Sequence, residues 1–145
     1  MFMNLTAVKF YGNSCPEFSE AAEIRKIVFL DEQQFSYDLD DVDEIAFHAV
    51  IYVDNTPIAA GRFFFDENNA PHIGRVAVLE KYRKMGVGRF LMNALEEIAA
   101  EQNASYVTLG AQLRAADFYS RIGYAPYGEI YYEEYCEHIN MKKML

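Results

Sequence analysis

Two glycines separated by one residue stand directly before an amphipathic run, and basic side chains surround them. Gly86 and Gly88 are flanked by Arg83, Lys84 and Arg89 in a chain whose formal net charge is −9. Glycines ahead of a helix leave the amides of its first turn open to close approach by a ligand. Those amides and the helix dipole favour an anion, with phosphate the usual ligand. The segment therefore predicts an anion-binding loop, with an ordinary strand-to-helix turn carrying solvated basic residues as the alternative.

Two common phosphate-binding motifs do not fit this loop. A dinucleotide-binding fingerprint requires a third glycine three positions after Gly88, where the chain has Leu91. A P-loop requires Gly-Lys-Ser or Gly-Lys-Thr, whereas Gly88 is followed by Arg89 and Phe90. These differences argue against a nucleotide-binding module.

Length and composition limit the classes of protein further. The chain has 145 residues, 52% of them hydrophobic, so we predict a single packed domain over residues 1–145. The excess of acidic residues repels a phosphate backbone and argues against nucleic-acid binding. No apolar run reaches the roughly 18 residues needed to span a bilayer, and the N-terminal residues alternate like a strand rather than forming a signal peptide. We expect a cytoplasmic protein with no membrane partner, in which Cys15 and Cys136 are free thiols.

Hydrophobic periodicity predicts the elements that position the loop. Strands are expected at 5–10, 46–54, 57–66, 72–79, 105–111, 129–135 and 138–144, and the apolar 72–79 segment is expected to be central. Helices are expected at about 14–30, 88–102 and 115–122, and the acidic segment 31–44 is expected to be a loop or a broken helix. Ser14 is expected to cap the first helix, and Gly123 to end the third. This order of elements describes a mixed α/β (α+β) fold.

Several segments resemble one superfamily of enzymes. RKMGVG, residues 83–88, is similar to the Arg/Gln-X-X-Gly-X-Gly/Ala pyrophosphate motif of the GNAT superfamily of N-acetyltransferases. DFYSRIGY resembles its Phe-Tyr-X-X-X-Gly-Phe signature, with Tyr124 in place of the second Phe. IRKIVFLDEQ, DDVDEIAFH and EHINMKKML resemble a bacterial branch of small, single-domain members. The resemblance covers nearly the whole chain and implies the GNAT fold, a mostly antiparallel sheet of about six to seven strands splayed at its centre, with helices on both faces.

The resemblance implies acetyl-coenzyme A as the donor, direct attack by a substrate amine, and no metal. Residues 85–89 would present amides to the pyrophosphate, and one central strand would pair with the pantetheine arm. That pairing requires the 73–79 and 105–111 strands to splay apart, helped by a bulge in the first. The amide of Val78 is expected to polarise the thioester carbonyl. The implied cofactor-binding residues are Val76, Ala77, Val78, Arg83, Lys84, Met85, Gly86, Val87, Gly88 and Arg89.

Three residues are candidates for proton transfer. Tyr119 stands where the resemblance implies a general acid for the departing thiolate, with simple packing under the cofactor as the alternative. His138 is the first candidate for the base, because a histidine before the last strand faces the acceptor in some relatives. Its alternative is a strand-start histidine bonded to backbone. Glu32 is the second candidate, acting through water, and a solvated loop residue is its alternative.

Four further residues are candidates for contact with the acceptor. Arg25 could orient a substrate carboxylate, or it could be solvated or paired across the fold. His48 could point into the same cleft or fill the core, and Arg75 could reach the cleft or neutralise a buried acid. Gln112 occupies a turn where many family members have Asn and some close relatives have Arg.

Together these residues predict a metal-independent N-acetyltransferase that acts on a primary amine of a small molecule or on an exposed amino group. The acidic segment 38–44 favours a cationic acceptor, although such runs are usually just solvated. The alternative function is a CoA- or acyl-CoA-binding sensor or interaction domain with little turnover. The tail is rich in tyrosine, which predicts either ordinary strand packing or the face of a homodimer.

Overall fold

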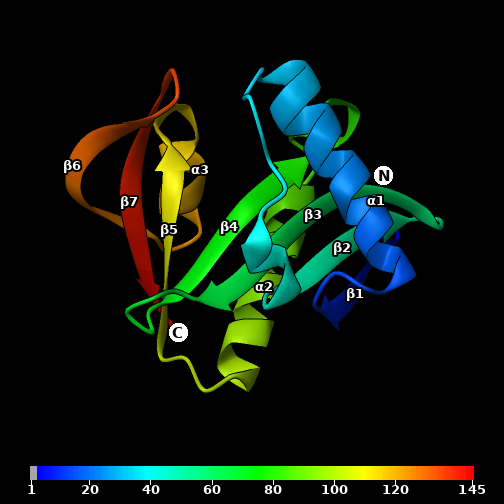
Figure 1. Ribbon diagram of the computed structural model, residues 1–145, viewed down its shortest axis with the longest axis horizontal. Coiled ribbons are helices and arrows are strands. Elements are labelled where there is room, and N and C mark those ends of the chain that lie inside the picture. Colours follow the sequence, from blue (N-terminus) through cyan, green and yellow to red (C-terminus); the bar gives the residue numbers. More distant parts are fainter. Residues whose placement is uncertain (1–2) are drawn as a thin grey trace.

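The structure, a computed structural model, describes residues 3–145 as one twisted sheet with helices on both of its faces (Figure 1). The strands are β1 Leu5–Tyr11, β2 Phe47–Val53, β3 Thr56–Phe65, β4 Pro71–Val78, β5 Tyr106–Gln112, β6 Ala125–Glu133 and β7 Cys136–Met144. The α-helices are α1 Pro16–Arg25, α2 Val87–Glu101 and α3 Ala116–Arg121. The π-helix η1 Lys26–Glu32 and the 3₁₀-helices η2 Asp41–Glu44, η3 Glu80–Tyr82 and η4 Leu113–Ala115 complete the elements.

The two strands at the centre of the sheet share fewer backbone pairs than any other neighbouring pair of strands. The strand order is β1-β2-β3-β4-β5-β7-β6, and every neighbouring pair is antiparallel except β4 and β5. These two parallel strands share a single backbone pair, His72 with Thr108, and then diverge toward their carboxyl ends (Figure 1). The predicted splay at the centre of the sheet is therefore confirmed.

A bulge in β4 accompanies this divergence. Ala60 of β3 pairs with Ala77, but Arg62 pairs with Gly74, so β4 contains one residue more than β3 over this stretch. Arg75 lies in the bulge and has a left-handed backbone, with φ of 51°. An extra residue bends a strand and increases its local twist, which turns the end of β4 away from β5.

Two hydrophobic clusters hold the helices on opposite faces of the sheet. The residues of α2 expected to lie at helical spacing, Leu91, Leu95, Ile98 and Ala99, are all buried in the larger cluster. The other cluster contains Ala21, Ile24 and Val28 of α1 and η1, packed on the strands from the opposite side. In Figure 1, α1 lies in front of β2 to β4 and α2 lies behind them.

The first helix departs from the prediction at both ends. Its N-cap is Cys15 rather than Ser14, and no side chain caps it; Pro16, with its fixed φ, supplies the first helical position. The α-helix ends at Arg25, and the chain then continues as a π-helix to Glu32, two residues beyond the end predicted near residue 30. The third helix ends as predicted, because Gly123 adopts φ of 104° directly after it.

Candidate active site

A cleft of about 1150 Å³ opens where β4 and β5 diverge. Its lining comes from η1 with the segment 33–38 after it, β4, the loop before α2 with the start of that helix, β5, η4 with α3, and the hairpin of β6 and β7. The cleft therefore collects residues from six separate parts of the chain.

The loop before α2 forms one end of this cleft. Gly86 is the N-cap of α2 with φ of 83°, a conformation that L side chains rarely adopt. The first helical bond runs from the amide of Phe90 to the carbonyl of Gly86, so the amides of residues 87–89 have no acceptor within the helix. Arg83, Lys84 and Arg89 line the cleft beside these amides. This end of the cleft suits a polyanion.

The other predicted loop residues contribute in different ways. Met85 is 55% exposed and Val87 is 1% exposed, and neither side chain lines the cleft, so only their backbone could take part. Gly88 lies against α3, where a Cβ would be 3.1 Å from the Phe118 ring, closer than an ordinary contact. The second glycine therefore lets α3 approach the start of α2.

Strand β4 presents backbone groups along one wall. The amide of Leu79 bonds to the carbonyl of Ile58 in β3. Because successive amides of a strand point to opposite sides, those of Val78 and Val76 point toward the cleft. Val76, Ala77 and Val78 all line it. This edge of β4 can therefore pair with an extended ligand.

Tyr119 of α3 lines the cleft. It is 8% exposed, and burial raises the pKa of its phenol above the ordinary value of 10. Its hydroxyl makes no hydrogen bond within residues 3–145. The hydroxyl oxygen is nevertheless not fully enclosed by the protein, because the enclosed side-chain atom without a partner in this part of the chain is Nε of Arg62. The phenol thus keeps its proton and can donate it into the cleft.

Glu32 lines the cleft but is already paired. Its carboxylate accepts two bonds of 2.6 Å from the guanidinium of Arg83, whose Nε also donates to the carbonyl of Val78 at 2.9 Å. These bonds from Arg83 hold the pKa of Glu32 below its ordinary value. A carboxylate held ionised in this way is a weak base, so the geometry does not favour Glu32 for proton transfer.

His138 is 5% exposed and also lines the cleft, where it stacks on Tyr131. Its Nδ1 donates to the carbonyl of Cys136 at 3.0 Å, because a carbonyl can only accept. Its Nε2 lies 3.6 Å from a carboxylate oxygen of Glu133. Both ring nitrogens therefore face oxygen acceptors of the chain itself.

Two of the four predicted acceptor residues lie in the cleft. Gln112 lines it and donates to the side chain of Gln33 at 2.8 Å, which links β5 to the end of η1. Arg75 lines the cleft from the bulge and also pairs with Asp38 at 2.9 Å and Asp40 at 3.2 Å. Arg75 thus combines the two roles expected for it, reaching the cleft and neutralising a buried acid.

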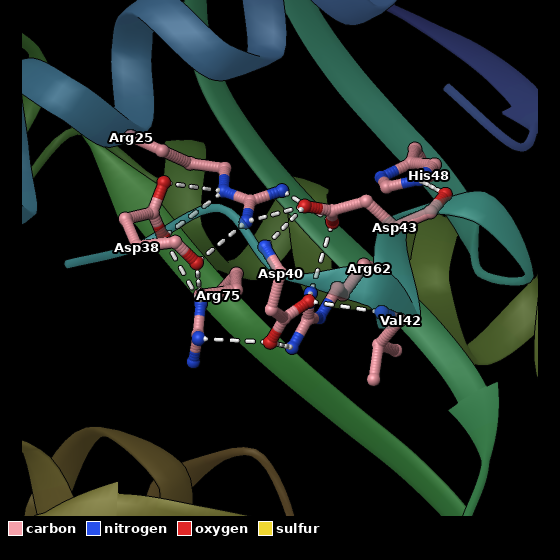
Figure 2. Close-up of polar contacts among 8 residues, drawn as sticks. All are labelled: Arg25, Asp38, Asp40, Val42, Asp43, His48, Arg62 and Arg75. Atoms are coloured by element: carbon pink, nitrogen blue, oxygen red, sulfur yellow. Dashed lines mark hydrogen bonds and ion pairs between the residues drawn. The ribbon is translucent and has the colours of Figure 1, made fainter. Parts of the chain in front are cut away.

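The other two predicted acceptor residues, Arg25 and His48, do not line the cleft, which corrects their interpretation as acceptor contacts. Figure 2 shows their contacts with the chain itself. Arg25 is 1% exposed, and each nitrogen of its guanidinium already bonds to a carboxylate, of Asp38 or of Asp43. His48 is also 1% exposed, and its Nε2 donates to the carbonyl of Asp43 at 3.1 Å. Its ring stacks on Phe10, and burial lowers its pKa. Both side chains therefore pack and bond inside the protein rather than facing the cleft.

Arg25 belongs to a buried ionic network beside the cleft (Figure 2). Its members are Arg25, Arg62, Arg75, Asp38, Asp40 and Asp43. Burial alone would raise the pKa of Asp43, but the bonds and charges of Arg25 and Arg62 outweigh it and hold that pKa below its ordinary value. The network has equal numbers of positive and negative groups, so Arg75 brings no surplus charge to the cleft.

The cleft also contains residues that were not predicted as site residues. His72 and Tyr131 line it, as do Asp38 and Arg114. His72 alternates with Gly74 along β4, so the two-residue period of a strand places both on one face. This alternation could have indicated from the sequence that His72 and Gly74 share a face of β4. Their position opposite β5 follows only from the three-dimensional structure.

A sheet opened at its centre, with free strand amides on one wall and an anion-binding helix start at its end, defines a coenzyme A-dependent acyltransferase as the class of protein. The sequence profile of the acetyltransferase (GNAT) domain matches residues 16–145, and the chain belongs to this family.

Known proteins agree with this assignment. The Bacillus subtilis protein YjcF, named as an uncharacterized N-acetyltransferase, is 34% identical over 110 residues, which cover 74% of this chain and 78% of YjcF. The structure of an acyl-CoA N-acyltransferase from Pseudomonas aeruginosa is 26% identical, with a TM-score of 0.86 and coverage of 97% of this chain and 99% of that one. A Bacillus anthracis structure described as a streptothricin acetyltransferase holds acetyl-coenzyme A; it is 21% identical, with a TM-score of 0.63 and coverage of 75% and 70%.

The chain is therefore an acetyl-coenzyme A-dependent N-acetyltransferase. Within residues 3–145, no group of three or more His, Cys, Asp or Glu side chains is placed to hold a metal ion. Over the same residues, none of the helices combines the length and the apolar character that a membrane crossing requires.

Proposed function

We propose that the protein transfers the acetyl group of acetyl-coenzyme A directly to a primary amine, either of a small molecule or of an exposed amino group. The observation that carries the proposal is the meeting of three features in one cleft. The start of α2 offers amides to an anion, the edge of β4 offers amides to an extended arm, and the Tyr119 phenol faces the same space. Together they can hold both the donor and its departing group.

In this proposal, three sets of groups in the chain have separate roles in the reaction. The amides of residues 85–89, with Arg83, Lys84 and Arg89 beside them, would hold the pyrophosphate. An amide of β4, that of Val78 or of Val76, would donate to the thioester oxygen as negative charge develops on it. Tyr119 would protonate the departing thiolate, whose ordinary pKa of about 8.5 makes it a fair leaving group.

The charges at the β4 bulge and at Glu133 of β6 favour a neutral or cationic acceptor between them. Arg75 is neutralised by Asp38 and Asp40, so the bulge offers no unbalanced cation for a substrate carboxylate. Glu133 lies at the opposite wall, is 58% exposed in its side chain, and lines the cleft. A carboxylate in this position can attract an ammonium group.

An acetyl-coenzyme A turnover screen tests this function. Release of free coenzyme A is followed with polyamines, amino acids, aminoglycosides and peptides as acceptors, and binding of coenzyme A is measured in parallel by calorimetry. We expect saturable binding, and turnover with one class of amine. Binding without turnover across the whole panel would support the sensor function instead, and absence of binding would refute both.

A further inference from the structure

His72 lies at the closed end of the cleft, where β4 and β5 share their one backbone pair. Its Nδ1 lies 3.4 Å from the hydroxyl of Thr108 on the neighbouring strand. That hydroxyl donates its own proton to the carbonyl of Pro71 at 3.1 Å. Thr108 is therefore left as an acceptor toward His72, and the ring proton of a neutral His72 belongs on Nδ1.

This arrangement leaves the other ring nitrogen, Nε2, with a free lone pair. Nε2 of His72 has no hydrogen-bond partner within residues 3–145. The only fully enclosed side-chain polar atom without a partner in this part of the chain is Nε of Arg62. Nε2 of His72 is therefore open to the space of the cleft that its side chain lines.

A glycine keeps space open beside this nitrogen. Gly74 lies two residues beyond His72, on the same face of β4. It lines the cleft, and the nearest atoms to a Cβ there would be those of the His72 ring, with Nε2 at 4.0 Å. A small nitrogen nucleophile can therefore approach Nε2 without displacing a side chain of β4.

The other two candidate bases have charged groups of the chain beside their proton-accepting atoms. Neutral His138, with its proton on Nδ1 toward the carbonyl of Cys136, also has a bare Nε2, but this atom lies 3.6 Å from the carboxylate of Glu133. Glu32 is bonded through both of its oxygens to Arg83. Nε2 of His72 has no carboxylate of the described residues within 4 Å, which distinguishes it from Nε2 of His138.

We propose that His72 is the general base of the acetyl transfer, with its free Nε2 taking the proton that the acceptor nitrogen loses. The proposal rests on the function proposed above. The lone pair of a neutral amine forms the C–N bond, the C–S bond breaks, and the thiolate receives the proton of Tyr119. The amine proton moves to Nε2, and exchange with solvent then returns His72 and Tyr119 to their starting states.

The surroundings of His72 keep its ring neutral near pH 7. Burial is the largest influence and lowers its pKa below 6.5. The charged groups that act on it are Asp66 and Glu133, which raise the pKa, and Arg62 and Arg75, which lower it. A neutral ring is the form that can accept a proton.

The test compares two substitutions that each keep one hydrogen bond. His72→Asn retains an N–H donor for Thr108 in the place of Nδ1 but has no group in the place of Nε2. His138→Asn makes the same change at the other histidine and retains a donor for Cys136. Each variant is assayed for kcat/KM against pH with an amine that the wild type acetylates, and calorimetry measures its affinity for coenzyme A.

For His72→Asn we expect a kcat/KM about 10²-fold below the wild type, within the range typical of a general base, with the affinity for coenzyme A unchanged. The kcat/KM of the wild type should fall as pH drops through the pKa of His72, which burial holds below 6.5. This acidic limb of the profile should be missing in His72→Asn but present in His138→Asn. A His72→Asn profile that keeps the wild-type limb, or loss of the limb in His138→Asn alone, overturns the proposal. Neither result touches the proposed function, which fails only if the wild type itself does not turn over.

A second measurement does not depend on a variant. The ¹⁵N resonances of the imidazoles in the wild-type protein report which ring nitrogen carries the proton. We expect His72 above its pKa to be protonated at Nδ1 and bare at Nε2. A proton on Nε2 would remove the lone pair on which the proposal depends.

Discussion

At the scale of single residues, Tyr119 has the environment that a proton donor requires. Its phenol stays protonated because burial raises its pKa, and its hydroxyl has no partner within the described chain that would compete for the proton. We expect Tyr119→Phe to lower kcat several-fold or more, within the roughly 10²–10⁴-fold range of acid–base catalysis. The affinity for acetyl-coenzyme A should not change, because the ring that packs in the cleft remains.

The measurement is kcat at saturating substrates, under conditions where the chemical step limits the rate, together with calorimetry on the same preparation. Tyr132→Phe serves as the matched control, because Tyr132 is 66% exposed and does not line the cleft. An unchanged kcat in Tyr119→Phe would exclude the phenol from the mechanism.

Residue type and spacing predicted the loop at the start of α2 but not the partners of each charge. The glycines and basic residues of 83–89 form a local motif, and Arg83, Lys84, Gly86, Gly88 and Arg89 line the cleft; their binding of the cofactor stays a prediction. Arg25 and His48 failed as acceptor contacts because their partners, Asp38 and Asp43, lie in an irregular segment whose path no periodicity describes. His72 was missed because its importance depends on the register of two strands that are 36 residues apart at Thr108.

At the scale of elements, a side chain of β6 reaches β5, although β7 lies between these two strands, and it ends against a glycine of β5. A Cβ at Gly110 would collide with the hydroxyl of Tyr131, whereas the next ring atom, Cζ, lies at 3.6 Å, an ordinary contact. We therefore expect Gly110→Ala to lower the free energy of unfolding by about 1–3 kcal/mol, the usual cost of overpacking.

A double-mutant cycle with Tyr131→Phe separates this collision from any general effect of alanine in a strand. Removal of the hydroxyl should restore most of the stability that Gly110→Ala loses, so the two changes should couple. Gly74→Ala is the control, because the nearest atom to its Cβ lies at 3.8 Å. Denaturant unfolding measures all of these variants, and additive effects of the two changes would contradict the predicted contact.

Periodicity predicted the order of the strands and α-helices correctly, because alternation and helical spacing are local properties of the sequence. It did not predict the π-helix after Arg25, since the usual helical period does not distinguish one extra residue per turn from a longer α-helix. It also placed the start of β6 at residue 129 rather than Ala125, because Gly128 and the shifted register between Tyr127 and Tyr131 interrupt the alternation.

At the scale of the whole molecule, the buried ionic network fastens the irregular segment before β2 to α1, β3 and β4. The folded state holds the pKa of Asp43 below 3.8, so the unfolded chain binds its proton more tightly. This contribution to stability is complete above the unfolded pKa of about 3.9 and is lost as pH falls through the folded pKa. The network is therefore expected to weaken in acid.

Asp43→Asn tests the contribution of this carboxylate. Because Arg25 and Arg62 would lose a buried counter-charge, we expect the free energy of unfolding at pH 7 to fall by about 3–5 kcal/mol. The variant should also lack part of the acid-induced loss of stability. Asp41→Asn, an exposed neighbour in the same 3₁₀-helix, is the control. Equal unfolding free energies for the two variants would contradict the role given to the network.

The single backbone pair between β4 and β5 has a consequence for the working cycle. In the proposed function, an extended donor along β4 would supply hydrogen bonds that the sheet itself lacks at this place, and would act as a temporary eighth strand. We therefore expect the two halves of the protein to be joined most firmly with the donor bound and least firmly after it has left. Each turnover would then alternately stiffen and loosen the middle of the molecule.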